Sequence, residues 1–159
     1  MAKKQRFLSI GFSIEGVGEL VSDFVFIGKQ LKNFSQPLKK SNSLLRRAID
    51  VNFKSEGTEF GEPWKPLSPV TLKQKSRLRF GQKQSLVRTG KMKRGFGSKL
   101  STNNLEIFNP TSYFPFHQSN KPRKKLPRRI MLKIDEKRRN EILRQFTIFL
   151  NKTVSHFGN

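Results

Sequence analysis

A block of positive charge in the middle of the chain is the feature that most restricts how the chain can fold. Residues 63–133 contain 18 Lys and Arg residues and a single acidic residue, Glu106, which gives a net charge of +17. The segments before and after this block have net charges of only +3 and +2. Like charges at this density repel one another, so the block requires counterions or an acidic partner. Candidate partners are DNA, an acidic protein surface and anionic lipid.

The apolar residues are few but bulky. Hydrophobic residues make up 34% of the 159 residues, and 15 residues are Phe. A disordered basic chain is not expected to hold so many aromatic residues, because such chains bury too little surface to offset the entropy lost on ordering. We therefore expect one folded domain over residues 1–159, with basic loops at about 79–85 and 119–129.

Two absences from the sequence exclude other classes of protein. The chain has no cysteine, which excludes a disulfide framework, a thiolate metal site and a Cys nucleophile. Its apolar stretches, residues 7–14 and 20–31, are interrupted by polar residues, and the second is too short to span a bilayer. We expect a soluble protein that assembles in the cytoplasm and has no membrane partner.

Hydrophobic periodicity predicts a strand and two helices in the first part of the chain. Apolar and polar residues alternate over residues 7–14, which is typical of a half-buried strand. From about residue 15 the period becomes helical, with an apolar stripe of Leu20, Phe24, Ile27 and Leu31. Ser35 is the expected N-cap of a second helix. This helix ends before Gly57 and has an apolar stripe of Leu38, Leu45, Ile49 and Phe53.

The remaining elements are expected to be shorter. A structured loop over residues 57–69 comes first, followed by a basic helix from Ser68-Pro69 to about Leu78 and a helical turn at residues 90–93. A hairpin with its turn at residues 101–104 is next, then a turn or short helix over residues 110–118. The last element is a terminal helix at about 135–155. In the hairpin, Phe96, Ser98 and Leu100 share one face of the first strand, and Leu105 and Ile107 share one face of the second.

The order of these elements indicates an α+β fold. We expect a small, mainly antiparallel sheet packed by two or three helices, with long basic loops.

The sequence gives no support for catalysis. His117 and His156 are 39 residues apart, with no carboxylate spaced as a metal co-ligand. A magnesium cluster of Glu56, Glu59 and Glu62 is conceivable, but a solvated acidic loop is the favoured interpretation. The glycines near residue 90 lack the spacing of a phosphate-binding loop, and no serine has the context of a nucleophile elbow. We therefore expect neither an enzyme nor a cofactor.

A run of short motifs occupies residues 60–132. The run contains Trp64-Lys65-Pro66-Leu67-Ser68-Pro69, then Thr89-Gly90, then Tyr113 with His117-Gln118, and then Arg128-Arg129. In order and spacing it resembles the phage virion morphogenesis (tail-completion) family of Mu-like and related tailed phages, over about half of the chain. Three positions depart from the pattern of that family. Met92 stands where Leu is usual, Ser119-Asn120 replaces a Gly, and Ile130-Met131-Leu132 replaces a Phe-Leu pair.

The resemblance implies a structural protein of the virion neck, a tail-completion or tail-terminator protein. Its copies would form a ring, with six the expected number, that joins or caps the tail at the head–tail interface. The implied partners are other copies of the chain, the neck, connector and tail-tube proteins, and the packaged DNA. The protein would be located in the virion after assembly in the host cytoplasm.

Two other functions are kept as alternatives. One is a capsid-assembly factor that is absent from the finished particle. The other is a general basic nucleic-acid-binding protein. The charge favours the second alternative, but the aromatic residues are not interleaved with basic ones as in a base-stacking platform.

Each motif has a structural and a functional interpretation. Trp64 is either the anchor of a loop or an interface hot spot, and the anchor is favoured. Thr89-Gly90 is expected to end one element and begin the next. His117-Gln118 is expected to be a hydrogen-bonded structural pair rather than an acid or base. Arg128-Arg129 either faces solvent or meets the carboxylates of a neighbouring subunit.

The candidate contact residues fall into two groups. The motif group comprises Trp64, Lys65, Pro66, Leu67, Ser68, Thr89, Gly90, Tyr113, His117, Gln118, Arg128 and Arg129. The group expected to contact DNA or an acidic partner comprises Lys83, Arg88, Lys91, Lys93, Arg94, Arg123, Lys124 and Lys125. If basic residues line the lumen of a ring they would hold DNA through its phosphates, and if they face outward they would dock acidic proteins. Docking of proteins is the favoured interpretation.

Overall fold

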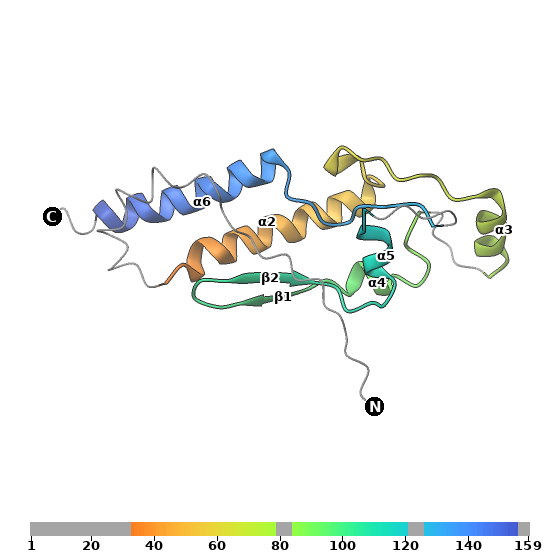
Figure 1. The fold of residues 1–159 in the computed structure, drawn as a ribbon, viewed down its shortest axis with the longest axis horizontal. Coiled ribbons are helices and arrows are strands. Elements are labelled where there is room, and N and C mark those ends of the chain that lie inside the picture. Colours follow the sequence, from red (N-terminus) through yellow and green to blue (C-terminus); the bar gives the residue numbers. More distant parts are fainter. Residues whose placement is uncertain (1–32, 79–83, 121–125, 156–159) are drawn as a thin grey trace, which may run out of the picture. The chain divides into compact units, whose positions relative to one another are not determined.

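The computed structural model describes residues 33–78, 84–120 and 126–155 (Figure 1). Its elements are α2 (Ser35–Lys54), the 3₁₀ helix η1 (Thr58–Phe60), α3 (Pro69–Arg77), α4 (Lys91–Arg94), β1 (Gly97–Leu100), β2 (Leu105–Phe108), α5 (Phe114–Gln118) and α6 (Glu136–Ser155). The helices and the two-stranded antiparallel sheet make an α+β fold, as the sequence predicts. The expected strand over residues 7–14 and the helix from about residue 15 lie outside the described residues.

The chain divides into two compact units. The described part of the first unit lies within residues 46–97 and 108–135, and that of the second comprises residues 33–45, 98–107 and 136–155. Helix α2 and the β-hairpin contribute residues to both units. All residues of the motif run quoted above belong to the first unit, so the candidate site lies within a single unit.

Helix α2 follows its predicted stripe but not its predicted cap. Leu45, Ile49 and Phe53 are almost fully buried, as expected. Ser35 is the first helical residue rather than the N-cap, because Oδ1 of Asn33 accepts a hydrogen bond from the Ser35 backbone N–H at 2.9 Å. The side chain of Asn33 therefore satisfies one of the free amides of the first turn.

Edge-to-face aromatic contacts form the core of the first unit. The ring of Phe53 packs against Trp64 with a centroid distance of 5.2 Å and against Phe96 at 6.2 Å. Phe96 in turn packs against Phe114 at 5.5 Å. Aromatic rings prefer this perpendicular arrangement, which brings the positive edge of one ring to the negative face of the next. The four rings join α2, the loop after it, the start of β1 and helix α5.

The β-hairpin has the predicted turn. The Ser101 N–H donates to the Asn104 carbonyl at 2.8 Å, and Oγ of Ser101 accepts from the Asn104 N–H at 3.1 Å. Leu105 and Ile107 are buried, as predicted for β2. The apolar face predicted for β1 is only partly buried, because Leu100 lies at the end of the strand beside the turn and is exposed.

Helix α6 packs through aromatic residues in the second unit. Phe146 and Phe149 lie 5.8 and 6.1 Å from the ring of Phe34, measured between ring centroids. The Phe34 N–H also donates to the carbonyl of Thr102 in the hairpin turn at 2.8 Å. Within the described ranges, no helix has the length and apolarity that crossing a membrane requires.

Candidate partner-binding site

The motif residues converge on one short segment, residues 129–132. The indole Nε1–H of Trp64 donates to the carbonyl of Ile130 at 2.9 Å, and Nδ2 of Asn52 donates to the same oxygen at 2.9 Å. Residues 130–132 are nearly inaccessible to solvent. A carbonyl that accepts two buried donors is fully satisfied, so this pair fixes the segment against α2 and the Trp64 loop.

Gln118 holds the same segment from the other side. Its Oε1 accepts from the backbone N–H groups of Met131 at 2.9 Å and Leu132 at 3.3 Å, and its Nε2 donates to the Leu132 carbonyl. The Arg129 N–H donates to the carbonyl of His117 at 3.0 Å. The amide side chain of Gln118 thus forms the hydrogen bonds that a neighbouring strand would otherwise form. The backbone groups of Met131 and Leu132 therefore have partners although this segment is not part of the sheet.

His117 is buried beside this segment. Its Nδ1 lies 3.4 Å from the carbonyl oxygen of Pro127. Burial lowers the pKa of His117 below its usual 6.5, the hydrogen bond to Pro127 opposes this shift, and the positive charge of Arg129 adds to it. The neutral imidazole is therefore favoured. These contacts are those of the hydrogen-bonded structural pair that the sequence predicts for His117 and Gln118.

The carboxylates of the acidic loop after α2 have partners within the chain. Glu62 forms ion pairs with Arg128 at 3.0 Å and with Lys133 at 2.9 Å. Oε1 of Glu56 accepts from the backbone N–H of Ser85 at 2.6 Å. Glu56 and Glu62 are both partly exposed, and their partners lie too far away in the sequence to be predicted from it. Among the residues that the structure describes, no group of three or more His, Cys, Asp or Glu could hold a metal ion.

Thr89 and Gly90 begin helix α4, as predicted. Gly90 has a φ of +72°, a left-handed conformation that glycine adopts without the steric penalty of a Cβ. Nη2 of Arg94 donates to the carbonyl of Thr89 at 2.7 Å. Arg94 therefore stabilises its own turn.

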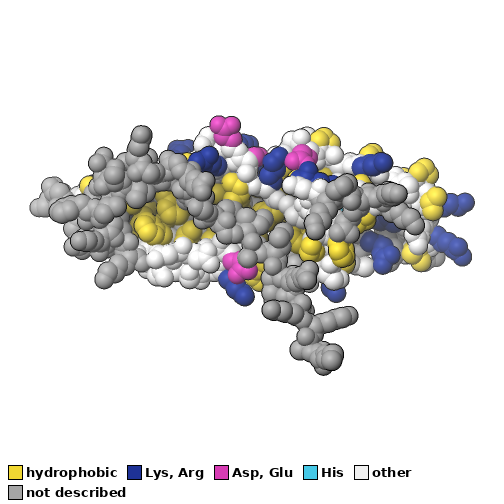
Figure 2. Space-filling view, viewed as in Figure 1, with side chains coloured by type: hydrophobic (Ala, Val, Ile, Leu, Met, Phe, Trp, Pro, Cys, Tyr) yellow, Lys and Arg dark blue, Asp and Glu magenta, His cyan; other side chains and the backbone are white. Residues whose placement is uncertain are grey.

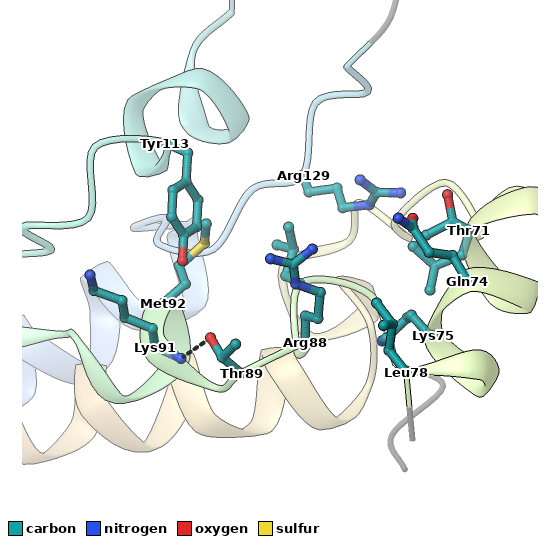
Figure 3. Close-up of a pocket in the computed structure, with 12 residues that line it drawn as sticks. Thr71, Gln74, Lys75, Leu78, Arg88, Thr89, Lys91, Met92, Tyr113 and Arg129 are labelled. Carbon is teal, nitrogen blue, oxygen red and sulfur yellow. Dashed lines mark hydrogen bonds between the residues drawn. The ribbon is translucent and has the colours of Figure 1, made fainter. Parts of the chain in front are cut away.

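A cavity of about 320 Å³ lies between α3, α4 and the chain that connects them (Figure 3). Four cationic residues line it, and none of the described lining residues is acidic. These cations are Lys75, Arg88, Lys91 and Arg129. Tyr113 and Met92 are also in the lining, so the cavity combines positive charge with an apolar part.

Two of the four cations are buried. Nζ of Lys75 donates to the carbonyls of Gln84 at 2.8 Å and Val87 at 3.4 Å. Burial lowers the pKa of Lys75, and the negative charge of Glu56 opposes this shift. Arg129 donates from Nη2 to the Lys65 carbonyl at 2.8 Å. Burial likewise lowers the pKa of Arg129, again against the charge of Glu56. Both cations are held by backbone carbonyls and have no ion pair within salt-bridge distance among the described residues.

The guanidinium of Arg129 retains an unused donor. Its Nε is buried and has no hydrogen-bond partner among the described groups. Figure 3 shows the guanidinium extending toward Thr71 and Gln74 of α3. A buried donor of a charged group without an acceptor is unfavourable for stability, and this nitrogen is too enclosed for a ligand in the cavity to reach it.

The structure brings together only some of the residues predicted as contacts. Those that line the cavity are Leu67, Arg88, Thr89, Lys91, Tyr113 and Arg129. Trp64, His117 and Gln118 are directed to the interior, and Ser68 caps α3 by accepting the Thr71 N–H at 3.2 Å.

The other predicted contact residues lie elsewhere. Lys65 and Pro66 are exposed. Lys93 and Arg94 do not line the cavity. The basic residues of the two predicted loops, Lys83, Arg123, Lys124 and Lys125, lie outside the described residues.

Two placements depart from the sequence interpretation. Arg129 was expected in a basic loop, facing solvent or a neighbouring subunit, but is buried, while Arg128 pairs with Glu62 of its own chain. Lys75 was not a candidate at all. No local pattern marks it, because its acceptors are backbone carbonyls 9 and 12 residues further along the chain.

Comparison of the chain with protein-family models, with curated proteins and with solved structures gives no match.

Proposed function

We propose that the chain is a structural protein of a phage virion, of the tail-completion type. Its copies would form a ring that joins or caps the tail at the head–tail interface. The observation that carries the proposal is the motif run over residues 60–132, which resembles the tail-completion family. The fold supports the proposal because residues from separate parts of the run contact one another. Trp64 and Gln118 both form hydrogen bonds with the backbone of residues 130–131, and Arg129 donates to the carbonyl of Lys65 in the Trp64 loop.

We infer that the protein acts by contact and not by catalysis. Two motif side chains with polar groups are engaged with backbone groups of their own chain, Trp64 with Ile130 and Gln118 with Met131. A side chain whose donors and acceptors are already used is poorly suited to proton transfer. The basic residues around the cavity remain as the surface that meets a partner, and neither a cofactor nor a membrane has a part in this proposal.

The location of the chain in the particle tests the proposal. Virions of the phage that encodes it are purified and analysed by mass spectrometry and by cryo-electron microscopy. We expect the chain in the particle, as a ring of density between the portal and the tail tube. Deletion of its gene should leave filled heads and complete tails that do not join.

Two outcomes would replace the proposal with an alternative. Absence of the chain from purified virions, together with defective heads in the deletion, would indicate a capsid-assembly factor. Nanomolar, strongly salt-dependent binding of the isolated monomer to any DNA duplex, with no copies in the virion, would indicate a general nucleic-acid-binding protein.

A further inference from the structure

We propose that the basic cavity of the first unit binds an acidic, partly apolar segment of a partner protein. A carboxylate of that segment would enter among Arg88, Lys91 and Arg129. The inference rests on the proposed function, because it specifies the chemistry by which the neck protein would dock its neighbour.

The excess of positive charge in the cavity lining favours an anion. Four cations line it and no acidic residue does, among the residues described. The charge of Glu56 offsets part of the charge of Lys75 and Arg129, but this single carboxylate lies outside the lining. In a recess that excludes part of the solvent, such cations attract an anion more strongly than they would on an open surface.

The apolar surface around the cavity favours a protein over a nucleic acid. Leu78 and Tyr113 both lie in the lining, and they are 51% and 39% exposed. Val70, in the first turn of α3, is 77% exposed. Figure 2 shows hydrophobic and basic side chains together at the end of the view where Figure 1 places α3. Acidic and apolar side chains of a peptide can match both kinds of surface, whereas a nucleic-acid backbone meets a protein mainly through its charged phosphates.

The recessed shape of the cavity also favours a protein segment over a DNA duplex. Phosphates of a DNA duplex lie on a convex cylinder and meet exposed lysines and arginines. Lys75 and Arg129 are each only 6% exposed, so the rod-like surface of a duplex does not reach them. The carboxylate of a Glu or Asp projects on a side chain and can enter a cavity of about 320 Å³.

Binding of a synthetic peptide tests the proposal. The probe is a nine-residue peptide of alternating Glu and Leu with blocked ends, and the matched probe has Gln in place of every Glu. Each is titrated into the full chain in about 0.15 M NaCl and followed by ¹⁵N amide chemical shifts and calorimetry. We expect the acidic peptide to bind at least ~10-fold more tightly than the Gln peptide, with the largest shifts at residues 71–78, 86–92, 113 and 129.

A pair of charge-matched variants separates the cavity from general attraction. Arg88→Gln combined with Lys91→Gln removes two charges from the lining. Lys73→Gln combined with Lys93→Gln removes two charges outside it. We expect the first variant to weaken peptide binding by at least ~10-fold and the second by less than ~2-fold. Lys75 and Arg129 are left intact because both are buried and hold backbone carbonyls, and thermal unfolding confirms that both variants fold.

Each contrary result overturns the proposal in a distinct way. An equal loss in both variants would show that only net charge matters. Tighter binding of a mixed-sequence 12-base-pair duplex, weakened equally in both variants, would show a DNA-binding surface. Displacement of the peptide by inorganic phosphate at a similar concentration would show a site for a free anion. None of these results depends on the virion, so a failure of the cavity is distinguishable from a failure of the proposed function.

Discussion

The buried polar side chains of the first unit are mostly engaged with backbone groups. Asn52, Trp64 and Gln118 donate to, or accept from, the main chain of residues 130–132. A hydrogen bond from a side chain to a backbone group requires the partner segment to follow a particular path. It does not require particular side chains on that segment. We therefore expect the side chains of residues 130–132 to tolerate exchange for other apolar residues as long as the path of the backbone is kept.

Trp64 illustrates what the sequence could decide and what it could not. Its position between two prolines predicts a rigid loop anchor, and the structure places the ring in the aromatic core with its N–H satisfied. The acceptor could not be predicted, because it lies 66 residues away in the sequence. Removal of a buried ring of this size costs about 3–5 kcal/mol of stability. A Trp64→Ala particle that fails to join head and tail would therefore report folding as well as contact.

His117 should make the stability of the protein depend on pH. Its pKa in the folded protein is lowered below 6.5 by burial, so the unfolded chain binds a proton more readily than the folded chain. The contribution of this residue to stability is therefore complete above pH 6.5 and is lost as the pH falls through the lowered pKa. We expect the free energy of unfolding in urea to decrease over that range.

The other histidine of the chain supplies the control for this effect. His117→Gln should remove the decrease in unfolding free energy below pH 6.5, whereas His156→Gln should retain it. An unchanged pH profile in the His117 variant would contradict the assignment. The ¹H NMR titration of the two imidazole rings gives an independent measurement of the lowered pKa.

Elements whose signals are local could be predicted from the sequence. Ser68 and Pro69 begin α3, and Ser101 to Asn104 close the hairpin, because cap and turn geometry involve residues two to four positions apart. The cap of α2, the burial of Arg129 and the role of Lys75 could not be predicted. The cap of α2 is local, but Asn33 and Ser35 are both suitable capping residues and the sequence does not decide between them. The positions of Arg129 and Lys75 depend on contacts with distant segments, on which periodicity carries no information.

The turn after α2 allows a test of two glycines with similar backbone conformation. Gly57 has a φ of +96° and Gly61 of +70°, so alanine at either position costs about 1–2 kcal/mol of backbone strain. A Cβ at Gly57 would also collide with the carbonyl of Glu62 and the ring of Trp64, whereas nothing lies within 4 Å of a Cβ at Gly61.

We therefore expect Gly57→Ala to destabilise the protein by roughly 3–5 kcal/mol and Gly61→Ala by only about 1–2 kcal/mol. Chemical denaturation of the two variants, each against the unmodified chain, measures this difference. Equal destabilisation would show that the collision is relieved by movement of the loop, and that the contact between Gly57 and Trp64 does not determine the turn.

The net charge of +22 governs how copies of the chain approach one another. Subunits of the same sign repel, and this repulsion opposes any ring until salt or a partner neutralises it. The screening length falls from about 10 Å in 0.1 M salt to about 3 Å in 1 M salt. A ring whose subunits meet through apolar surface should therefore form more readily at high salt.

Sedimentation velocity of the purified chain tests this expectation. We expect a shift from monomer toward a larger species as NaCl increases from about 0.1 to about 1 M. Sucrose at matched osmolality, which does not screen charge, serves as the control. Dissociation of a preformed oligomer by salt would instead indicate that ion pairs hold the subunits together.

The order of the contacting segments along the chain has a consequence for synthesis. Three groups form hydrogen bonds with residues that are synthesised much later. These groups are the backbone carbonyl of Lys65 and the side chains of Trp64 and Asn52, and their partners lie 64, 66 and 78 residues further along the chain. At about 5–20 residues per second, the ribosome needs roughly 3–13 s to make the 66 residues between Trp64 and its acceptor. During that interval the aromatic residues of α2 and its following loop lack the segment that covers them. The first unit therefore completes its core only after residue 132 has left the ribosome.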